Sequence, residues 1–389
     1  MPTAEGLSAV FDRPGELTVG IEEELMVLDA DTLDFAPRAD ELLAGLHGEA
    51  RFKGELMAAQ IEHVTAPAAT VGQAATQIAE GRRRLARAGA GSIVLAAAGA
   101  HPFANELGEL STAERYRHNR EEYGIVARRQ LVFGLHVHVR VPGAQRAVAV
   151  YNGMRAHLPE LAALAANSPF HAGRDTGLAS IRPKIAETLP RQGIPPTLAD
   201  LGELAEALRW GERAGALAVP GMWWWELRLH PVLGTVEVRV PDQQTTVADT
   251  AAVAAVVHSL VRRLADRFDN GEPIPLPLTW RIQENRWSAC RHGLTGTLAA
   301  LDTGAPRPAR KRLRELLAEL APVAADLGCA DELEAAVRLA ESTGAERQRA
   351  VAVDGGPRAV TRWLAEQFCS TDPIGALPGV CPGGTRASG

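Results

Sequence analysis

The chain has 389 residues, 46% of them hydrophobic, and a formal net charge of −6 at neutral pH. This length and composition indicate a folded globular protein with one large core or two lobes. The acidic balance argues against a general nucleic-acid binder, and no segment has the apolar length of a signal peptide or a membrane span. The sequence therefore predicts a cytoplasmic protein with neither nucleic-acid nor membrane partners.

The first predicted element is a strand over residues 18–28, an apolar and β-prone run with consecutive glutamates in its middle. Side chains alternate along a strand, so Glu22 and Glu24 share one face. Like charges on one face destabilise a sheet unless a cation lies between them, and carboxylate oxygens are ligands of hard divalent cations. The segment predicts a metal-binding strand, although an edge strand with solvated glutamates fits the pattern equally well.

A second β-like segment, residues 51–65, carries Glu55 and Glu62. Glu62 stands among apolar neighbours, so its carboxylate either faces solvent or is paired with a metal or a base, because burying an unpaired charge is prohibitive. A helix is expected over residues 71–90, where Arg82 belongs to an arginine cluster near the C-terminal end. Cations suit that end of the helix dipole, and the cluster predicts a solvated basic face.

A buried strand is expected over residues 92–100, and a second strand over residues 131–141 alternates apolar and polar side chains. The alternation puts His136 and His138 on one face. Two imidazoles at this spacing, with a glycine two residues before the first, are placed as a strand would offer them to a metal or a phosphate. The alternative is a pair of core histidines with ordinary hydrogen bonds.

A long helix is expected over residues 144–166, followed by a polar, glycine-punctuated loop over residues 171–183 that contains Arg182. Loops of this kind carry ligands more often than cores do. The loop is therefore a candidate lid over a site, although a plain surface loop fits the same residues.

Residues 222–231 and 235–242 are expected to form the two arms of an antiparallel hairpin. Alternation places two acid–base pairs on the faces of these arms: Glu226 with Arg228, and Glu237 with Arg239. These pairs belong either to a ligand site or to a cross-strand ladder of glutamate and arginine that binds nothing.

Together these segments present ionisable side chains at alternate positions of several strands. The pattern predicts an α+β fold in which an antiparallel sheet has one polar, funnel-like face and one apolar face covered by helices. Its ligand set is rich in carboxylates and has no thiolates, which suits Mg²⁺ or Mn²⁺ better than zinc. Magnesium beside arginines indicates phosphoryl chemistry, and since no Walker-type loop occurs, ATP would be held by the sheet face itself.

These segments resemble, in their order along the chain, the signatures of the type 2 glutamate–cysteine ligase (carboxylate–amine ligase) family. The resemblance extends over about residues 17–300 and rests on motifs at residues 20–24, 60–65, 134–139, 166–170, 173–177, 235–240 and 284–287. It implies a core like that of glutamine synthetase and the guanidino kinases. It also implies an enzyme that joins a carboxylate, glutamate or a similar amino acid, to an amine such as cysteine at the expense of ATP.

By this resemblance, the magnesium ligands would be Glu22, Glu24, Glu55, Glu62, His136 and Glu237. Arg239 would contact the ATP phosphates, with His138 and Glu24 also on the nucleotide side, and Arg182 would receive a substrate carboxylate. The reaction would pass through an acyl phosphate, with Arg239, Arg182 and Glu22 as catalytic residues.

The expected domain organisation is a ligase core over residues 1–300 with a helical part of the same domain over residues 301–370. Glycine and proline dominate from residue 371 onward, and residues 371–389 are expected to form a flexible tail.

Two other classes of function fit the same residues. A metallohydrolase would bind zinc through His136, His138 and a carboxylate and would need neither ATP nor Arg239. A non-catalytic protein on the same scaffold would bind ATP or an amino acid without turnover. The sequence does not identify the carboxylate or the amine, and the tryptophan run at residues 223–225 could form an interface of a homo-oligomer.

Overall fold

The centre of the computed structural model, which describes residues 1–46 and 48–374, is a seven-stranded sheet with strand order β2-β3-β1-β5-β9-β8, in which β4 also pairs with β1. Neighbouring strands run antiparallel. This confirms the predicted α+β fold with an antiparallel sheet. The strands are β1 (Val19–Asp29), β2 (Phe52–Gly54), β3 (Gln60–Val64), β4 (Ile93–Ala96), β5 (Leu135–Arg140), β8 (Leu227–His230) and β9 (Thr235–Val238).

Strand β1 organises the sheet because it pairs along both edges. Residues Glu22 to Met26 pair with β3 on one edge, while the other edge is shared between β5, along residues Val19 to Glu23, and β4, along residues Met26 to Asp29. The carboxylates of β1 therefore have strands on both sides, as those of an edge strand would not.

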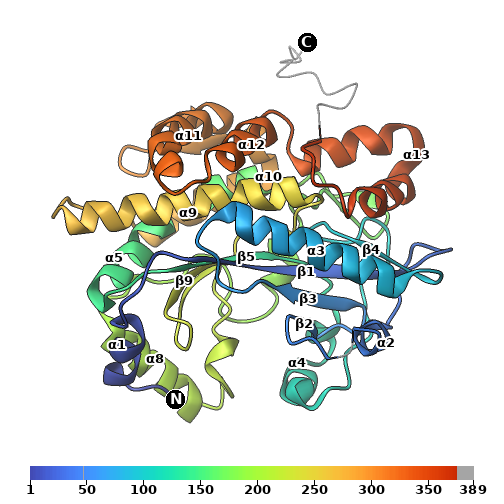
Figure 1. Ribbon diagram of the computed structural model, residues 1–389, viewed down its shortest axis with the longest axis horizontal. Helices are drawn as coiled ribbons and strands as arrows, with labels where there is room; N and C mark the ends of the chain where they lie inside the picture. Colours follow the sequence, from blue (N-terminus) through green and yellow to red (C-terminus); the bar gives the residue numbers. More distant parts are fainter. Residues whose placement is uncertain (47, 375–389) are drawn as a thin grey trace.

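Three helices cover one face of the sheet: α3 (Val71–Gly89), α5 (Ala144–Met154) and α9 (Val247–Asp269) (Figure 1). Helix α9 is buried over most of its circumference, as expected of a helix that is apolar nearly all round. Alternate residues of β1, β5 and β9 point into the same hydrophobic core, including Ile21, Val137 and Val238. Side-chain alternation then leaves the ionisable residues of these strands on the opposite face.

Four more helices follow α9 along the chain: α10 (Thr279–His292), α11 (Ala309–Asp326), α12 (Ala330–Glu341) and α13 (Gly344–Gln367). Helices α11 and α12 pack on α9, and α13 packs against β4. The apolar side chains of α11 and α12 belong to the same hydrophobic core as the sheet. Most of the predicted tail, residues 375–389, lies outside the described residues.

The opposite face of the sheet is bordered by short elements instead of long helices. Helices α1 (Ala4–Phe11) and α8 (Leu201–Arg213) lie toward one end, and α2 (Ala39–Ala44) and α4 (Arg117–Arg128) toward the other (Figure 1). Hairpin β8–β9 forms as predicted, with His230 opposite Thr235. The remaining elements include α6 (Leu158–Leu164), α7 (Arg182–Ala186) and two small hairpins, β6 (Phe170–His171) with β7 (Arg174–Asp175) and β10 (Thr297–Ala299) with β11 (Pro306–Pro308).

Two expectations about the helices are wrong. The predicted helix over residues 144–166 is interrupted by a 3₁₀ turn, Arg155–His157, between α5 and α6. Pro159 lies in the first turn of α6, where no hydrogen bond from its backbone nitrogen is needed. In the middle of a continuous helix the same position would need an N–H donor, which proline lacks.

The second correction concerns Arg82, which was expected on a solvated face but is fully buried. Its guanidinium forms an ion pair with Glu23, the β1 glutamate that points toward the helices. Gln243 and Thr250 also donate to Glu23, at 2.7 and 3.0 Å. Burial alone favours the protonated acid, but the charge of Arg82 and the neighbouring His63 lower the pKa of Glu23 to about 2. The pair thus fixes β1 to α3 from behind the polar face.

Candidate active site

The register of the sheet gathers the predicted site residues on the face away from α9. Glu62 lies opposite Glu24, and His136 lies opposite Glu22. Farther along the sheet, His138 lies opposite Glu237, which in turn lies opposite Arg228. The other predicted residues come from segment ends: Glu55 follows β2, Arg239 follows β9 and Arg182 begins α7.

A first group of possible metal ligands consists of Glu22, His138 and Glu237, which offer donor atoms within 4.8 Å of one another. His138 Nε2 lies 3.1 Å from Glu22 Oε1 and 3.9 Å from Glu237 Oε1, yet this buried nitrogen has no hydrogen-bond partner among the described residues. The other ring nitrogen, Nδ1, is held by Thr235 Oγ1 at 2.9 Å. A histidine oriented through one nitrogen, with the other facing carboxylates, is typical of a metal ligand.

Electrostatics keep the carboxylates of this group ionised. Burial opposes the charged form of Glu22, but His136 and His138 outweigh it and hold the pKa of Glu22 well below its ordinary value. Burial likewise opposes ionisation of Glu237, and Arg228 is the largest influence that lowers its pKa. Charged oxygens and a free imidazole nitrogen are a suitable donor set for a divalent cation.

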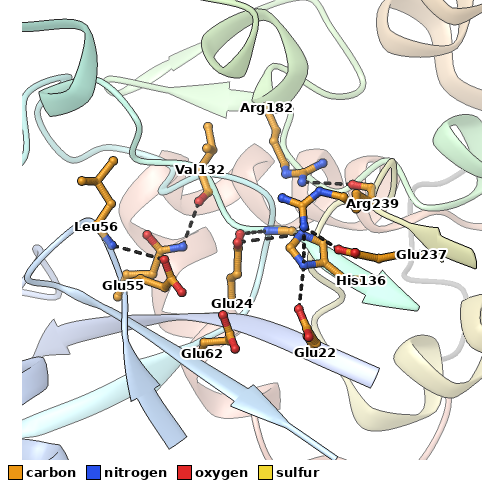
Figure 2. A network of polar contacts seen from close by, with 12 residues as sticks. Glu22, Glu24, Glu55, Leu56, Glu62, Val132, His136, Arg182, Glu237 and Arg239 are labelled. Carbon is orange, nitrogen blue, oxygen red and sulfur yellow. Dashed lines mark hydrogen bonds and ion pairs between the residues drawn. The ribbon is translucent and has the colours of Figure 1, made fainter. Parts of the chain in front are cut away.

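A second carboxylate group lies at the other end of the polar face and consists of Glu24, Glu55 and Glu62 (Figure 2). Lys53 Nζ is 2.9 Å from Glu62, and the Tyr116 hydroxyl donates to Glu55 at 3.0 Å. Burial, followed by the charges of Glu62 and Glu24, raises the pKa of Glu55 well above its ordinary value. This crowding of acidic groups around one lysine is the arrangement that a divalent cation would relieve.

His136 and Arg239 connect the two groups. His136 Nδ1 is 3.2 Å from Glu22. Its Nε2 is buried, has no hydrogen-bond partner in the part of the chain that the structure describes, and lies 3.8 Å from Glu24. Arg239 Nη1 donates to Glu237 at 2.6 Å, and Figure 2 shows its guanidinium above the imidazole of His136. The positively charged guanidinium of Arg239 is thus fixed among anionic and imidazole groups, where it could also contact a phosphate.

A cavity of about 180 Å³ opens beside these residues. Its lining includes the predicted residues Glu24, Glu55, His136, Arg182 and Arg239. The Arg182 guanidinium donates to the backbone carbonyls of Val240 and Arg239 at 3.3 and 3.2 Å. Two arginines and several carboxylates on one small cavity can hold a ligand that carries both signs of charge.

Gly134 allows Arg182 and Glu24 to approach the same peptide. Its N–H donates to Glu24 Oε2, and a Cβ on this residue would lie 2.3 Å from Arg182 Nη2. Gly134→Ala should therefore displace the guanidinium and lower kcat/KM about tenfold or more, chiefly through a higher KM, for any substrate that binds Arg182 through an anionic group.

Steady-state kinetics with each substrate varied in turn would measure the effect of Gly134→Ala. Gly54→Ala is the matched control, since its Cβ would meet Leu43 and Asp40 at ordinary distances of 3.6 and 3.7 Å. Equal kinetics in the two variants would contradict the role of Gly134.

Sequence reasoning missed several residues of this site. Arg228 was left open between a ligand site and a ladder and was paired with Glu226, whereas the structure pairs it with Glu237. The alternation of β2 and β3 could have identified Lys53, which lies opposite Glu62. Tyr116 comes from a 3₁₀ turn, Glu114–Tyr116, without a pattern that would point to it.

The candidate lid, residues 171–183, is folded as a small hairpin followed by the start of α7. Asp175 forms an ion pair with Arg349 of α13, with both contacts at 2.8 Å. The movement of this segment as a lid stays a prediction.

The tryptophan run at residues 223–225 is only partly exposed, because Trp224 packs edge-on against Tyr123 and under Arg191.

Comparison with known proteins places these features in a family context. The family model described as glutamate-cysteine ligase family 2 matches residues 18–360. A relative from Rubrobacter xylanophilus, which carries the provisional name glutamate–cysteine ligase 2-3, is 41% identical over 356 residues, covering 90% of this chain and 96% of the relative. One from Thermobifida fusca, provisionally named glutamate–cysteine ligase 2, is 36% identical over 355 residues and covers 89% of each chain.

Two solved structures share the fold at low sequence identity. Glutamate–cysteine ligase from Francisella tularensis in complex with AMP aligns with a TM-score of 0.67 at 13% identity, covering 94% of this chain and 91% of that one. A bifunctional glutathione synthetase from Pasteurella multocida aligns with a TM-score of 0.65 at 12% identity, covering 94% of this chain and 53% of that one. None of the helices within the described ranges is long and apolar enough to cross a membrane.

Proposed function

The chain belongs to glutamate-cysteine ligase family 2, and we propose that it is an ATP-dependent ligase that joins the carboxylate of glutamate or a similar amino acid to an amine such as cysteine. The observation that carries the proposal is the polar face of the sheet, where two groups of possible metal ligands lie on either side of His136 and Arg239. Enzymes of phosphoryl transfer use carboxylates to hold metal ions and arginines to stabilise the charge of the phosphate.

The donor set favours Mg²⁺, with Mn²⁺ as an alternative, over zinc, because carboxylate oxygens dominate it and thiolates are missing from the described residues around it. Glu22, His138 and Glu237 would hold one ion, and Glu24, Glu55 and Glu62 another, with His136 Nε2 available beside Glu24. Bound there, the ions would neutralise charge on the phosphates of ATP. The family resemblance assigned His138 to the nucleotide. Because its Nε2 faces Glu22 and Glu237, we assign it to the metal instead.

The chain's own residues would position the two reacting groups. Arg239, fixed by Glu237, would contact the γ-phosphate, and Arg182 would hold the carboxylate substrate within the cavity. A carboxylate oxygen attacks the γ-phosphorus and ADP leaves, giving an acyl phosphate. The amine then attacks the acyl carbon, phosphate leaves, and one proton is released with the amide product.

The test is phosphate release from ATP and Mg²⁺ across a panel of carboxylates and amines, with amide formation followed by mass spectrometry. The proposal predicts phosphate release that requires both a carboxylate and an amine for full turnover. Hydrolytic activity that needs zinc and no ATP would favour the metallohydrolase. Nucleotide binding without any turnover would favour a binding protein. The proposed substrates are cytoplasmic metabolites, in keeping with the location expected from the sequence.

Arg239→Lys should lower kcat about 100-fold while the protein stays folded, because a point charge does not replace a planar fork that contacts Glu237 and a phosphate together. Single-turnover phosphate release would measure the chemical step. Arg140→Lys, on the neighbouring β5 but bonded to the carbonyls of Arg13 and Pro14, is the matched control. An unchanged rate in Arg239→Lys would remove Arg239 from the mechanism.

A further inference from the structure

Beside the two arginines, the cavity wall contains Glu226, which the proposed chemistry does not use and which forms a buried ion pair with Arg286 of α10. We propose that Glu226 binds the α-ammonium group of the carboxylate substrate, so that the enzyme selects α-amino acids through their charged head group. The inference rests on the proposed ligase function and adds a specificity-determining residue to it.

Arg286 fixes the orientation of Glu226. Its Nε and Nη2 donate to the two carboxylate oxygens, the former at 2.7 Å, in a bidentate pair. Glu226 is 7% and Arg286 3% exposed. Such a pair holds a planar carboxylate in one orientation, which a flexible, solvated glutamate would not keep.

Glu226 retains capacity to accept further hydrogen bonds. An ionised carboxylate has about four acceptor positions, and among the described residues only Arg286 donates to the side chain of Glu226. Burying an ion pair carries a desolvation cost that packed apolar side chains avoid. A purely structural link between α10 and the sheet therefore leaves the polar character of this wall unexplained, whereas an ammonium ligand would use the free acceptor positions.

The position of Glu226 relative to Arg182 matches an amino-acid head group. Both side chains line the same cavity, and both segments are anchored on the backbone of Arg239: its N–H donates to the Glu226 carbonyl at 2.8 Å, and its carbonyl accepts from Arg182 at 3.2 Å. An α-carboxylate on Arg182 and an α-ammonium on Glu226 would thus lie side by side.

The rest of the cavity suits the remainder of such a substrate. Trp224 and Leu189 provide apolar surface for methylene groups, and Glu24 and Glu55 mark the carboxylate group of the polar face where the metal and phosphate are proposed. An amino acid bound by its head group would direct a side-chain carboxylate toward the reacting phosphate.

The experiment compares matched pairs of carboxylates that differ only in the α-ammonium group: glutamate with glutarate, aspartate with succinate, and alanine with propionate. The wild-type protein should prefer at least one amino acid over its partner by about 100-fold in kcat/KM, because an analogue without the ammonium group leaves the free acceptor positions of Glu226 unsatisfied inside the cavity. In Glu226→Gln this preference should fall about tenfold or more. Glu187→Gln, the same charge change at a nearby glutamate bonded to Lys184, should retain it.

Three outcomes overturn the inference: equal use of every pair by the wild type, binding of none of these acids, or an unchanged preference in a folded Glu226→Gln. Because removing Glu226 leaves the Arg286 charge buried, folding is checked by circular dichroism, and the wild-type preference decides the matter if the variant fails to fold. If no carboxylate supports ATP turnover, the proposed function fails instead. Calorimetric binding of the same pairs, in the presence of Mg²⁺ and a non-hydrolysable ATP analogue, then still tests Glu226.

Discussion

Replacement of Glu22 by glutamine is expected to lower Mg²⁺-dependent ATP turnover about 100-fold or more while the protein remains folded. Changing groups that merely support metal ligands often costs 10- to 100-fold in affinity or activity, so loss of a ligand itself should cost at least as much. Glu22 accepts from His136 and faces His138 Nε2, and a glutamine can keep the first contact through its amide oxygen. The variant therefore removes the charge of the Glu22 side chain while keeping its size and shape.

Activity as a function of Mg²⁺ concentration, together with direct Mn²⁺ binding followed by electron paramagnetic resonance, would measure the loss in Glu22→Gln. Partial recovery at high Mg²⁺ is expected if the variant has weaker metal affinity. Glu41→Gln removes the same charge from α2, where the exposed Glu41 pairs, among the described residues, only with Arg38, and should behave as wild type. Wild-type turnover and Mn²⁺ affinity in Glu22→Gln would remove Glu22 from the metal site.

The positions of the ionisable strand residues were predictable because alternation is a local property. Once residues 18–28, 131–141 and 235–242 are assigned to strands, the faces of Glu22, His136 and Glu237 follow. What makes the residues a site is the pairing register, which sets Glu22 opposite His136 and His138 opposite Glu237. Alternation does not give this register, so only the resemblance to a family indicated that these residues belong to one site. The roles of the individual residues stay predictions.

The errors arise where tertiary contacts between distant segments override a local pattern. Arg82 lies in a run that suggests solvent exposure, yet its partner Glu23 is 59 positions away and points into the helical layer. Arg286 similarly finds Glu226 across 60 positions. No spacing rule connects such residues, because their approach depends on how helices pack on the sheet. Charge sign alone therefore predicted a solvated arginine where the fold contains a buried ion pair.

Arg82→Met should lower the free energy of unfolding by about 3–5 kcal/mol, the range found when one partner of a buried ion pair is removed. The loss leaves Glu23 charged and without its main counter-ion. It also deprives the carbonyls of Thr245, Gln244 and Phe368 of their hydrogen bonds from the guanidinium, at 2.8, 3.0 and 2.9 Å. Urea unfolding followed by circular dichroism would measure the change.

Two controls decide whether the effect of Arg82→Met comes from the ion pair. Arg83→Met makes the same substitution at the next residue of α3, which is exposed, and should change stability by less than about 0.5 kcal/mol. The double variant Glu23→Leu/Arg82→Met should be more stable than Arg82→Met alone, because the second change removes the unpaired charge. If the double variant were instead less stable by the sum of the single losses, the two side chains would not be coupled, and Glu23 would not owe its ionised state behind the polar face to Arg82.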